Sequence, residues 1–512
     1  MRRLQAGEWG VPGGFAIAAF LLYLLPGLVG EYGPFIDELY YVACAERLAW
    51  GYVDQPPLSL AVLRVARAVL GEGLVALRLP AALLGACVVF GVGLLARRLG
   101  AGRFGQAIAC GAMLTASVFQ IIFGYYSMNS IEMLLWFACG WLLLEIERRR
   151  DGRLWLLFGA VAGLGLLNKH TMVLFGLGLG IGLLATPARR HLSRGWIWFG
   201  AGIALLVVAP NLLWQAAHGW PSLEFYRNAH GEKVLLAPPH QVLLLQVLFL
   251  NPGTLPVWAA GIVWFLRRRD PLDLRHLGVL ALVLLGVVAV GRESRPDRIA
   301  GLFPLLFAAG GVAWETLVRR PRWRVGRIAL PACLMVTGVL FLPLTVPIAS
   351  PPALVAYLEF LHFQPQIERG AGKRTPLPQW FADRLGWQQL VDDVAAARDK
   401  LSPEERRQAL YFAPSYGQAG ALEWLGRERG LRPVYCTHNS WFLWGPPPDP
   451  VEVAIVLGED AAYLGSLFEE VELAGIHDCE WCMPWRDEMP VWIVRRARVR
   501  LADRWPEWKH FE

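Results

Sequence analysis

The chain has 512 residues, of which 55% are hydrophobic and 18% are charged, and its formal net charge is +7. Soluble domains carry about a quarter charged residues, so this composition excludes a wholly soluble protein. The 12% aromatic content excludes intrinsic disorder. The basic residues form short clusters between apolar runs, which is typical of membrane orientation signals and not of a nucleic-acid-binding surface. We therefore expect no nucleic-acid partner.

Apolar runs dominate the chain up to about residue 348, and eleven of them suit a membrane-spanning helix of about 20 residues or a shortened one. They cover about 13–30, 80–96, 105–123, 129–146, 154–167, 170–186, 196–217, 241–266, 277–291, 298–318 and 327–348. We predict a polytopic α-helical membrane domain over 1–348. Residues 350–512 have ordinary globular composition and predict a second domain.

Lys and Arg in short loops favour the cytoplasmic side of a membrane. Six basic clusters, at 2–3, 97–103, 148–153, 189–194, 267–275 and 319–327, fall between spans of the parity that places them on the side of the N-terminus. We expect a cytoplasmic N-terminus, a retained first helix instead of a cleaved signal, and an extracytoplasmic C-terminal domain.

The predicted first external loop, 31–79, holds two acids directly after the first span, Asp37 and Glu38. A carboxylate at such a place is partly desolvated, so its basicity can be tuned; solvated loop acids are the alternative. Amphipathic helical spacing over 43–50 and again up to about Leu70 predicts helices at the membrane surface.

Asp54 precedes Pro56 and Pro57, which predict a rigid turn. This carboxylate either shares a cation or a proton with another, or caps its own backbone. His230 could complete a divalent metal site with one of the acids, or be a polar loop residue.

Further charged residues lie at the predicted outer ends of apolar segments. Glu132 and Lys169 stand where charge is rare and often functional, with snorkelling as the alternative for the lysine. Lys233 is notable because Lys is much rarer than Arg in this chain. Arg292 and Arg295 break the charge rule in an external turn, which indicates an anionic ligand such as a lipid phosphate.

Two motifs are absent from the sequence. It contains no G-x-x-x-x-G-K-[ST] loop and no Asp-x-Asp pair. We therefore expect no nucleotide cofactor, and an energy-coupled pump is disfavoured.

In the tail, helix-like and strand-like stretches alternate after about residue 385, which predicts a small α/β domain with a partly parallel sheet. The predicted helices cover 387–400, 417–429 and 461–470, and the predicted strands 409–413, 433–436, 451–457, 471–476 and 491–494. Cys479 and Cys482 favour a structural disulfide in an exported domain. Zinc binding with His477 and His438 is the alternative.

Taken together, the motifs resemble the bacterial members of glycosyltransferase family 39, related to protein O-mannosyltransferases and lipid A aminoarabinose transferases. The segments that carry the resemblance are 37–41, 54–58, 78–80, 168–171, 211–214, 218–220, 438–446 and 505–511. Each is weak alone, but their order and spacing are specific and span nearly the whole chain.

The resemblance implies a C-type glycosyltransferase fold and an inner-membrane enzyme. Such an enzyme transfers a sugar from a polyprenyl-phosphate carrier to a lipid, glycan or protein hydroxyl on the outer face, with inversion. It implies Asp37 as general base supported by Glu38, with Lys169, Arg292 and Arg295 at the leaving phosphate. It also implies that Asp54 takes the place of an acid that helps to hold a metal ion in some relatives.

The sequence departs from the family at two places: Gln55 stands where relatives carry a cationic residue, and Glu132 lacks the proline of the usual Asp-x-Pro. A transporter or flippase of a lipid-linked anion remains the competing class. Transporters often show internal repeats, and no obvious repeat is present.

Overall fold

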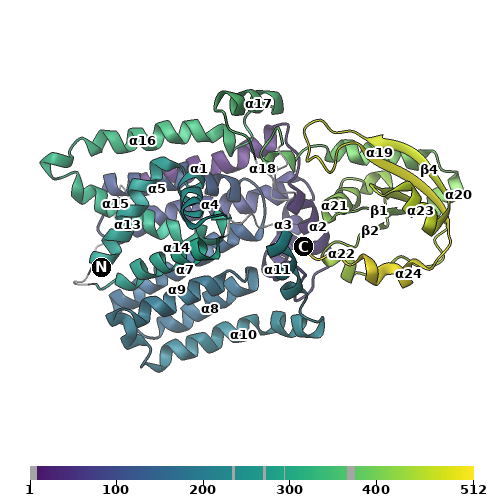
Figure 1. Cartoon of the computed structure of the whole chain (residues 1–512). Helices are drawn as coiled ribbons and strands as arrows, with labels where there is room; N and C mark the ends of the chain where they lie inside the picture. The colour runs from purple at the N-terminus through teal and green to yellow at the C-terminus, as the bar shows by residue number, and fades with distance from the viewer. Residues whose placement is uncertain (1–8, 233–236, 269–271, 293–294, 366–374) are drawn as a thin grey trace.

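The computed structural model describes residues 9–232, 237–268, 272–292, 295–365 and 375–512, without the side chains of 230–232. A bundle of apolar helices forms one part of the molecule, and a sheet with its covering helices forms the other (Figure 1). Three earlier helices lie beside the C-terminal elements: α2 (Ile36–Glu46), α3 (Leu58–Leu70) and α11 (Pro221–Glu232).

Within the described residues, six segments are long and apolar enough to cross a membrane. They are α1 (Gly10–Val29), α4 (Leu74–Arg98), α7 (Met128–Arg149), α10 (Gly195–Ala217), the segment Pro296–Leu317 that ends in α15 (Phe303–Leu317), and the segment Pro321–Leu344 that contains α16 (Gly326–Phe341). Counting each of two bent helix pairs as one span gives up to eight. The protein is a multi-pass membrane protein.

Two predicted spans are not continuous helices. The stretch 105–123 is α5 (Arg103–Thr115) and α6 (Ser117–Phe123), bent by 64°, and 241–266 is α12 (Pro239–Phe249) and α13 (Leu255–Arg267), bent by 92°. The second bend has a local cause, since Asn251 takes a positive φ of 68° and Pro252 has no N–H to continue the helix. Each of these two predicted stretches is thus a bent helix pair, which length and composition allow to count as one broken span.

The other three predicted spans are shorter apolar helices: α8 (Leu154–Asn168), α9 (Met172–Leu184) and α14 (Arg275–Gly291). Every one of the eleven predicted stretches is thus helical in the main, while length and composition mark six to eight of them as spans. The number eleven stays a prediction.

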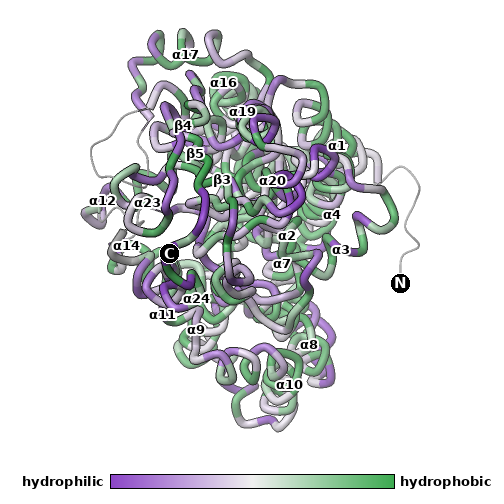
Figure 2. The backbone as a smooth tube through the Cα atoms, turned by 90° about the vertical axis from the view of Figure 1, so that its right-hand side faces the viewer, coloured by the Kyte–Doolittle hydropathy of each residue, from purple (hydrophilic) through white to green (hydrophobic). Residues whose placement is uncertain are grey.

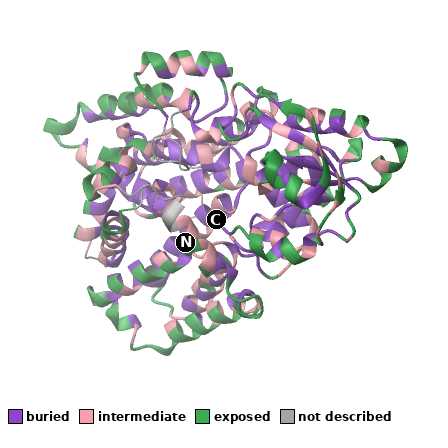
Figure 3. Ribbon diagram, turned by 45° about the vertical axis from the view of Figure 1, so that its right-hand side comes forward, coloured by how far each residue is buried: buried purple, intermediate pink, exposed green. Residues whose placement is uncertain are grey.

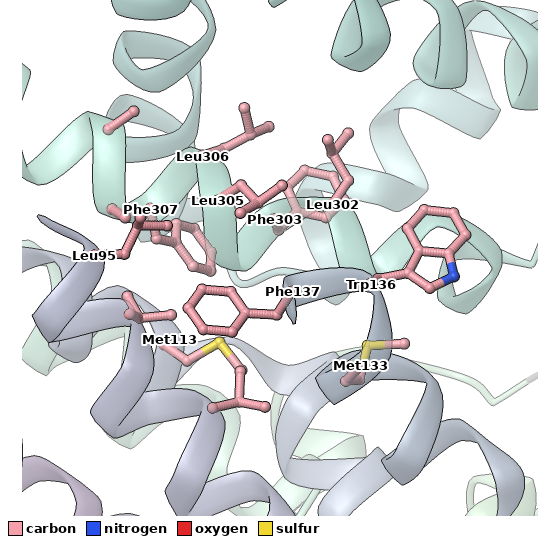
Figure 4. Packing of buried hydrophobic residues seen from close by; sticks show 14 of the residues in the cluster. Leu95, Met113, Met133, Trp136, Phe137, Leu302, Phe303, Leu305, Leu306 and Phe307 are labelled. Atoms are coloured by element: carbon pink, nitrogen blue, oxygen red, sulfur yellow. The ribbon is translucent and has the colours of Figure 1, made fainter. Parts of the chain in front are cut away.

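The core of the bundle is built from large apolar side chains of α4, α5, α7 and α15, with Trp136 and Phe137 facing the row from Leu302 to Phe307 (Figure 4). Outer helices carry exposed apolar residues, such as Leu206 on α10 and Ile328 on α16. Such surfaces suit lipid contact. Figure 3 shows exposed segments on the periphery and buried ones in the interior.

The first loop folds differently from the expectation. Helix α2 covers Ile36–Glu46, so the predicted helix over 43–50 was wrong in its bounds. Its residues 38–45 are buried, and Leu39 shares a core with Trp387 and Ile455 of the C-terminal part. Gly420 permits this packing, because a Cβ there would lie 2.7 Å from the Leu39 main chain. Helix α3 (Leu58–Leu70) matches the predicted amphipathic stretch and exposes Val69.

The C-terminal part contains a five-stranded sheet of order β2-β1-β3-β5-β4. Its strands are β1 (Leu410–Phe412), β2 (Val434–Tyr435), β3 (Val453–Leu457), β4 (Phe468–His477) and β5 (Met489–Ala497). Strands β1, β2 and β3 pair in parallel and β5 pairs antiparallel to both β3 and β4, so the partly parallel sheet is confirmed.

Most helices of the C-terminal part are short. They are α17 (Pro351–Phe360), α18 (Gln379–Ala382), α19 (Trp387–Asp399), α20 (Pro403–Gln408), α21 (Tyr416–Trp424), α22 (Ser440–Leu443), α23 (Ala461–Leu467) and α24 (Leu501–Arg504). Residues 468–470, predicted as helix, begin β4 instead. Figure 2 shows that α20 is largely hydrophilic, unlike the long hydrophobic stretches of the bundle.

Candidate functional site

The site lies where α2 begins, at the junction of the bundle and the C-terminal part. Helix α2 starts after Phe35, whose N–H donates to Glu38 Oε2 at 2.7 Å. The second carboxylate oxygen, Oε1, accepts from the main-chain N–H of Tyr126 at 2.9 Å. Glu38 is fully buried. It therefore caps the helix and ties it to the loop before α7, fixing the neighbouring Asp37 in place.

Asp37 is partly exposed and accepts a hydrogen bond from the hydroxyl of Tyr416, at the start of α21, at 3.1 Å. Asp54 accepts from the hydroxyl of Tyr40 at 2.8 Å, and the rings of Tyr40 and Tyr416 lie 4.9 Å apart. Two carboxylates from different segments thus face two phenols that pack on each other. Burial, with the charges of Asp37 and then Asp54, raises the pKa of Tyr41 well above its usual range.

The turn that holds Asp54 is fixed by the C-terminal part. Val53 N–H donates to the hydroxyl of Ser440 at 3.1 Å, and Ser440 N–H donates to the hydroxyl of Tyr40 at 3.2 Å. The predicted rigid turn is present: Tyr52 N–H donates to Gln55 O at 3.1 Å. Asp54 is thereby held beside α2.

Glu132 and Lys169 form a buried ion pair, with Nζ 2.9 Å from Oε2 and side-chain exposures of 3% and 11%. Lys169 also donates to Asn129 Oδ1 at 2.7 Å, and the Thr171 hydroxyl donates to Glu132. The lysine side chain points inward to this acid and not outward to the membrane surface, so the snorkelling alternative was wrong.

The two predicted phosphate-binding arginines lie in different surroundings. Arg292 is exposed and ends α14 with a positive φ of 57°. Arg295 contacts Asp297 through Nε and Nη2, both at 3.3 Å. Burial and the charges of Asp37 and Asp297 raise the pKa of Tyr125, while Arg384 and Arg295 oppose them.

Of the two remaining candidates, Lys233 lies outside the described residues, and the side chain of His230 lies outside the described side chains. The residues that sequence reasoning missed, Tyr416 and Arg384, come from the C-terminal part. Tyr416 lies 379 positions along the chain from Asp37, and no local spacing links them.

Among the described residues, one group could hold a metal ion: His438, His510 and Glu512, whose ligand atoms lie within 4.8 Å of one another. His438 packs on Tyr416 with ring centroids 4.7 Å apart, which places the group next to the partner of Asp37. Both histidines also line a cavity of about 410 Å³ near the carboxyl ends of β1 and β2.

All eight cysteines are free. The favoured disulfide between Cys479 and Cys482 was therefore wrong for this structure. The Cys482 thiol instead donates to the main-chain oxygen of Cys479 at 3.0 Å. The zinc alternative does not join these cysteines to His438, because that side chain lies with His510.

Comparison with known proteins gives a family match over part of the chain and a fold. The family described as dolichyl-phosphate-mannose-protein mannosyltransferase matches residues 54–214. No curated protein matches the chain.

Among solved structures, the apo state of ArnT from Cupriavidus metallidurans matches with 15% identity and a TM-score of 0.63 over 95% of this chain and 98% of that one. The same protein bound to undecaprenyl phosphate matches with 16% identity and a TM-score of 0.62, over 96% and 98%. The chain thus has the fold of ArnT, and the resemblance seen in the sequence is confirmed for this fold and for residues 54–214.

Proposed function

We propose that the protein is a membrane glycosyltransferase that transfers a sugar from a polyprenyl-phosphate carrier to a hydroxyl acceptor, with inversion. The observation that carries the proposal is Asp37, an acid fixed at the start of α2 and bonded to a neutral phenol, in a fold shared with a protein that binds undecaprenyl phosphate. The family match over 54–214 supports the same reaction class.

In this mechanism Asp37 is the general base. Its carboxylate takes the proton of the acceptor hydroxyl, and the hydroxyl oxygen attacks the anomeric carbon from the face opposite the carrier. The bond between the anomeric carbon and the phosphate oxygen breaks, and the polyprenyl phosphate leaves with the bonding electrons. Glu38 acts as a positioning residue, because both of its oxygens are engaged by main-chain N–H groups.

Cations near the junction would stabilise the leaving phosphate. Lys169, Arg292 and Arg295 remain the proposed set, with Lys169 held by Glu132 and Arg295 by Asp297. Glu132 orients the lysine in this scheme. Lys233 stays a further candidate.

The orientation is also part of the proposal. With a cytoplasmic N-terminus, α2 and the C-terminal part lie on the extracytoplasmic side of a bacterial inner membrane. The carrier then reaches the site from lipid and the acceptor from the aqueous side. Cysteine-free variants with single cysteines in exposed loops, labelled by an impermeant thiol reagent in intact cells, test this orientation.

Sugar transfer from a labelled polyprenyl-phosphate pool to acceptors in membranes tests the function. Asp37→Asn should reduce transfer by about 10²-fold or more, because a general base is lost. Asp151→Asn, at an exposed acid in the turn before α8, is the matched control and should leave transfer unchanged. Equal transfer by Asp37→Asn and wild type would remove the base assignment. Carrier movement across the bilayer without transfer would favour the transporter.

A divalent metal ion is a further part of the proposal. Two imidazoles and a carboxylate at His438, His510 and Glu512 suit zinc, and a bound ion there would orient an acceptor polar group next to Tyr416. Asp54 with His230 is the alternative ligand set.

Metal content of the purified full chain separates these sets. Loss of bound metal in His510→Ala but not in the exposed His218→Ala supports the group of three. Loss in Asp54→Asn supports the alternative set, and a metal-free wild type contradicts both.

A further inference from the structure

Two buried arginines flank Gly33, just before the start of α2. Arg78, in α4, is fully buried, and Arg384, between α18 and α19, has 3% exposure. Within the described part of the chain, the Nε and Nη1 atoms of both guanidinium groups have no hydrogen-bond partner. Buried guanidinium donors without partners are costly, so this pair calls for an acceptor.

The charge at this place does not balance. Glu38 is the carboxylate nearest to Arg78, at 3.9 Å, and both its oxygens are already engaged by N–H groups. Arg78 donates to the main-chain oxygen of Gly33 at 2.6 Å. Burial and the like charge of Arg78, opposed by Glu38, lower the pKa of Arg384 to about 10. Two cations thus share one carboxylate, leaving an excess positive charge.

This excess charge adjoins the proposed catalytic acid. The guanidinium of Arg384 lies 5.4 Å from the ring centroid of Tyr125, and that ring lies 4.4 Å from the ring of Phe35. Asp37 and Arg384 act on the same tyrosine. Arg384 therefore reaches the junction from the C-terminal part. The cations that were predicted from the sequence all belong to the earlier, helical part of the chain.

Two other cations of the site, Lys169 and Arg295, are already paired. Lys169 contacts Glu132 at 2.9 Å, and Arg295 contacts Asp297 at 3.3 Å. A phosphate monoester would compete with those carboxylates, whereas at Arg384 it would compensate a charge and accept from unpaired donors.

We propose that Arg384, backed by Arg78, binds the phosphate of the polyprenyl carrier, so that the C-terminal part supplies a cation to the leaving group. This inference rests on the proposed function and names a phosphate-binding residue for it. Arg384 then stabilises negative charge as the bond from the anomeric carbon to the phosphate breaks.

Arg486 provides a matched control. It is also a buried arginine of the C-terminal part, and its guanidinium lies 4.0 Å from the ring centroid of Trp387. Unlike Arg384, it donates to the main-chain oxygens of Ala382 and Leu385, and it contacts Asp383. Arg486→Lys should lower the temperature of unfolding and leave phosphate binding unchanged.

The test measures binding of a polyprenyl phosphate to the purified full chain in detergent. Arg384→Gln should weaken binding about tenfold or more, and Arg384→Lys should restore part of it because the charge returns. Polyprenol, which lacks the phosphate, should bind all variants equally. Phosphatidylglycerol and inorganic phosphate separate the carrier from a general lipid headgroup or a free anion.

The outcomes are distinguishable. Equal polyprenyl-phosphate affinity in wild type and a folded Arg384→Gln, or no phosphate-dependent binding by wild type, overturns the inference. Arg384-dependent binding of phosphatidylglycerol alone also overturns it, in favour of a structural lipid. If the carrier binds in an Arg384-dependent way but the wild type transfers no sugar, the phosphate site stands and the proposed function is overturned.

Discussion

The acids at the junction fall into two regions that differ in the groups facing them. At the start of α2 and in the turn before α3, Asp37 and Asp54 face the phenols Tyr416 and Tyr40. In α7 and after α14, Glu132 and Asp297 face Lys169 and Arg295. A carboxylate facing a neutral donor remains available to a proton, whereas one facing a cation is committed to an ion pair. The first region suits a base, and the second orients cations.

The largest effect on stability should come from breaking the second region. Lys169→Met leaves Glu132 buried without its cation, which should lower the free energy of unfolding by about 3–5 kcal/mol. Unfolding of the detergent-solubilised chain measures the change. The double variant Lys169→Met with Glu132→Leu should recover most of the loss, and no recovery would mean that the pair is not the source of the stability.

A smaller effect should follow from removing one phenol of the first region. Tyr416→Phe deletes the hydrogen bond to Asp37, which is worth about 1.5–3 kcal/mol when the acceptor is charged, so kcat should fall about tenfold or more. Steady-state transfer kinetics measure this change. Tyr463→Phe, at an exposed tyrosine of α23, is the control. An unchanged kcat in Tyr416→Phe would show that the phenol does not position the base.

The smallest effect should come from Asp393, an acid outside both regions that pairs with His477. Burial lowers the pKa of His477, but hydrogen bonds with Cys479 and with Asp393, at 2.7 Å, outweigh it and raise the pKa above its usual value. A raised folded-state pKa stabilises the fold fully below the unfolded pKa of about 6.5, and this stability is lost as the pH rises through the folded pKa.

Asp393→Asn should therefore lower the pKa of His477 and destabilise the chain more at pH 5.5 than at pH 8.5, by no more than about 1 kcal/mol. An NMR titration of the imidazole and thermal unfolding at the two pH values measure both effects. Asp392→Asn, at the adjacent acid that pairs with Arg429, is the control. Equal destabilisation at both pH values would separate Asp393 from the charge of His477.

Part of the site was predictable because it is local in sequence. Asp37 and Glu38 follow the first span, and the prolines after Asp54 predict its turn. Their roles were harder to separate, because adjacent residues of one helix turn point to different surroundings. Only the partners show that Glu38 caps α2 while Asp37 faces the junction.

The ion pair of Glu132 and Lys169 shows the same limit. Both residues were singled out by their depth in apolar sequence, yet their contact joins α7 to the end of α8 across 37 positions. Arg384 carried no signal, since an arginine in globular sequence is ordinary until burial and missing partners make it exceptional.

The sequence by itself determined the helical bundle, the partly parallel sheet and the segments that carry the acids, because hydrophobic runs and short periodicities are local properties. Tertiary structure alone decided the bends at 116 and 251, the burial of α2 beneath the C-terminal part, and the pairing of each charge. Packing brings together groups hundreds of positions apart, and in a buried junction the identity of the facing group decides what a charge can do.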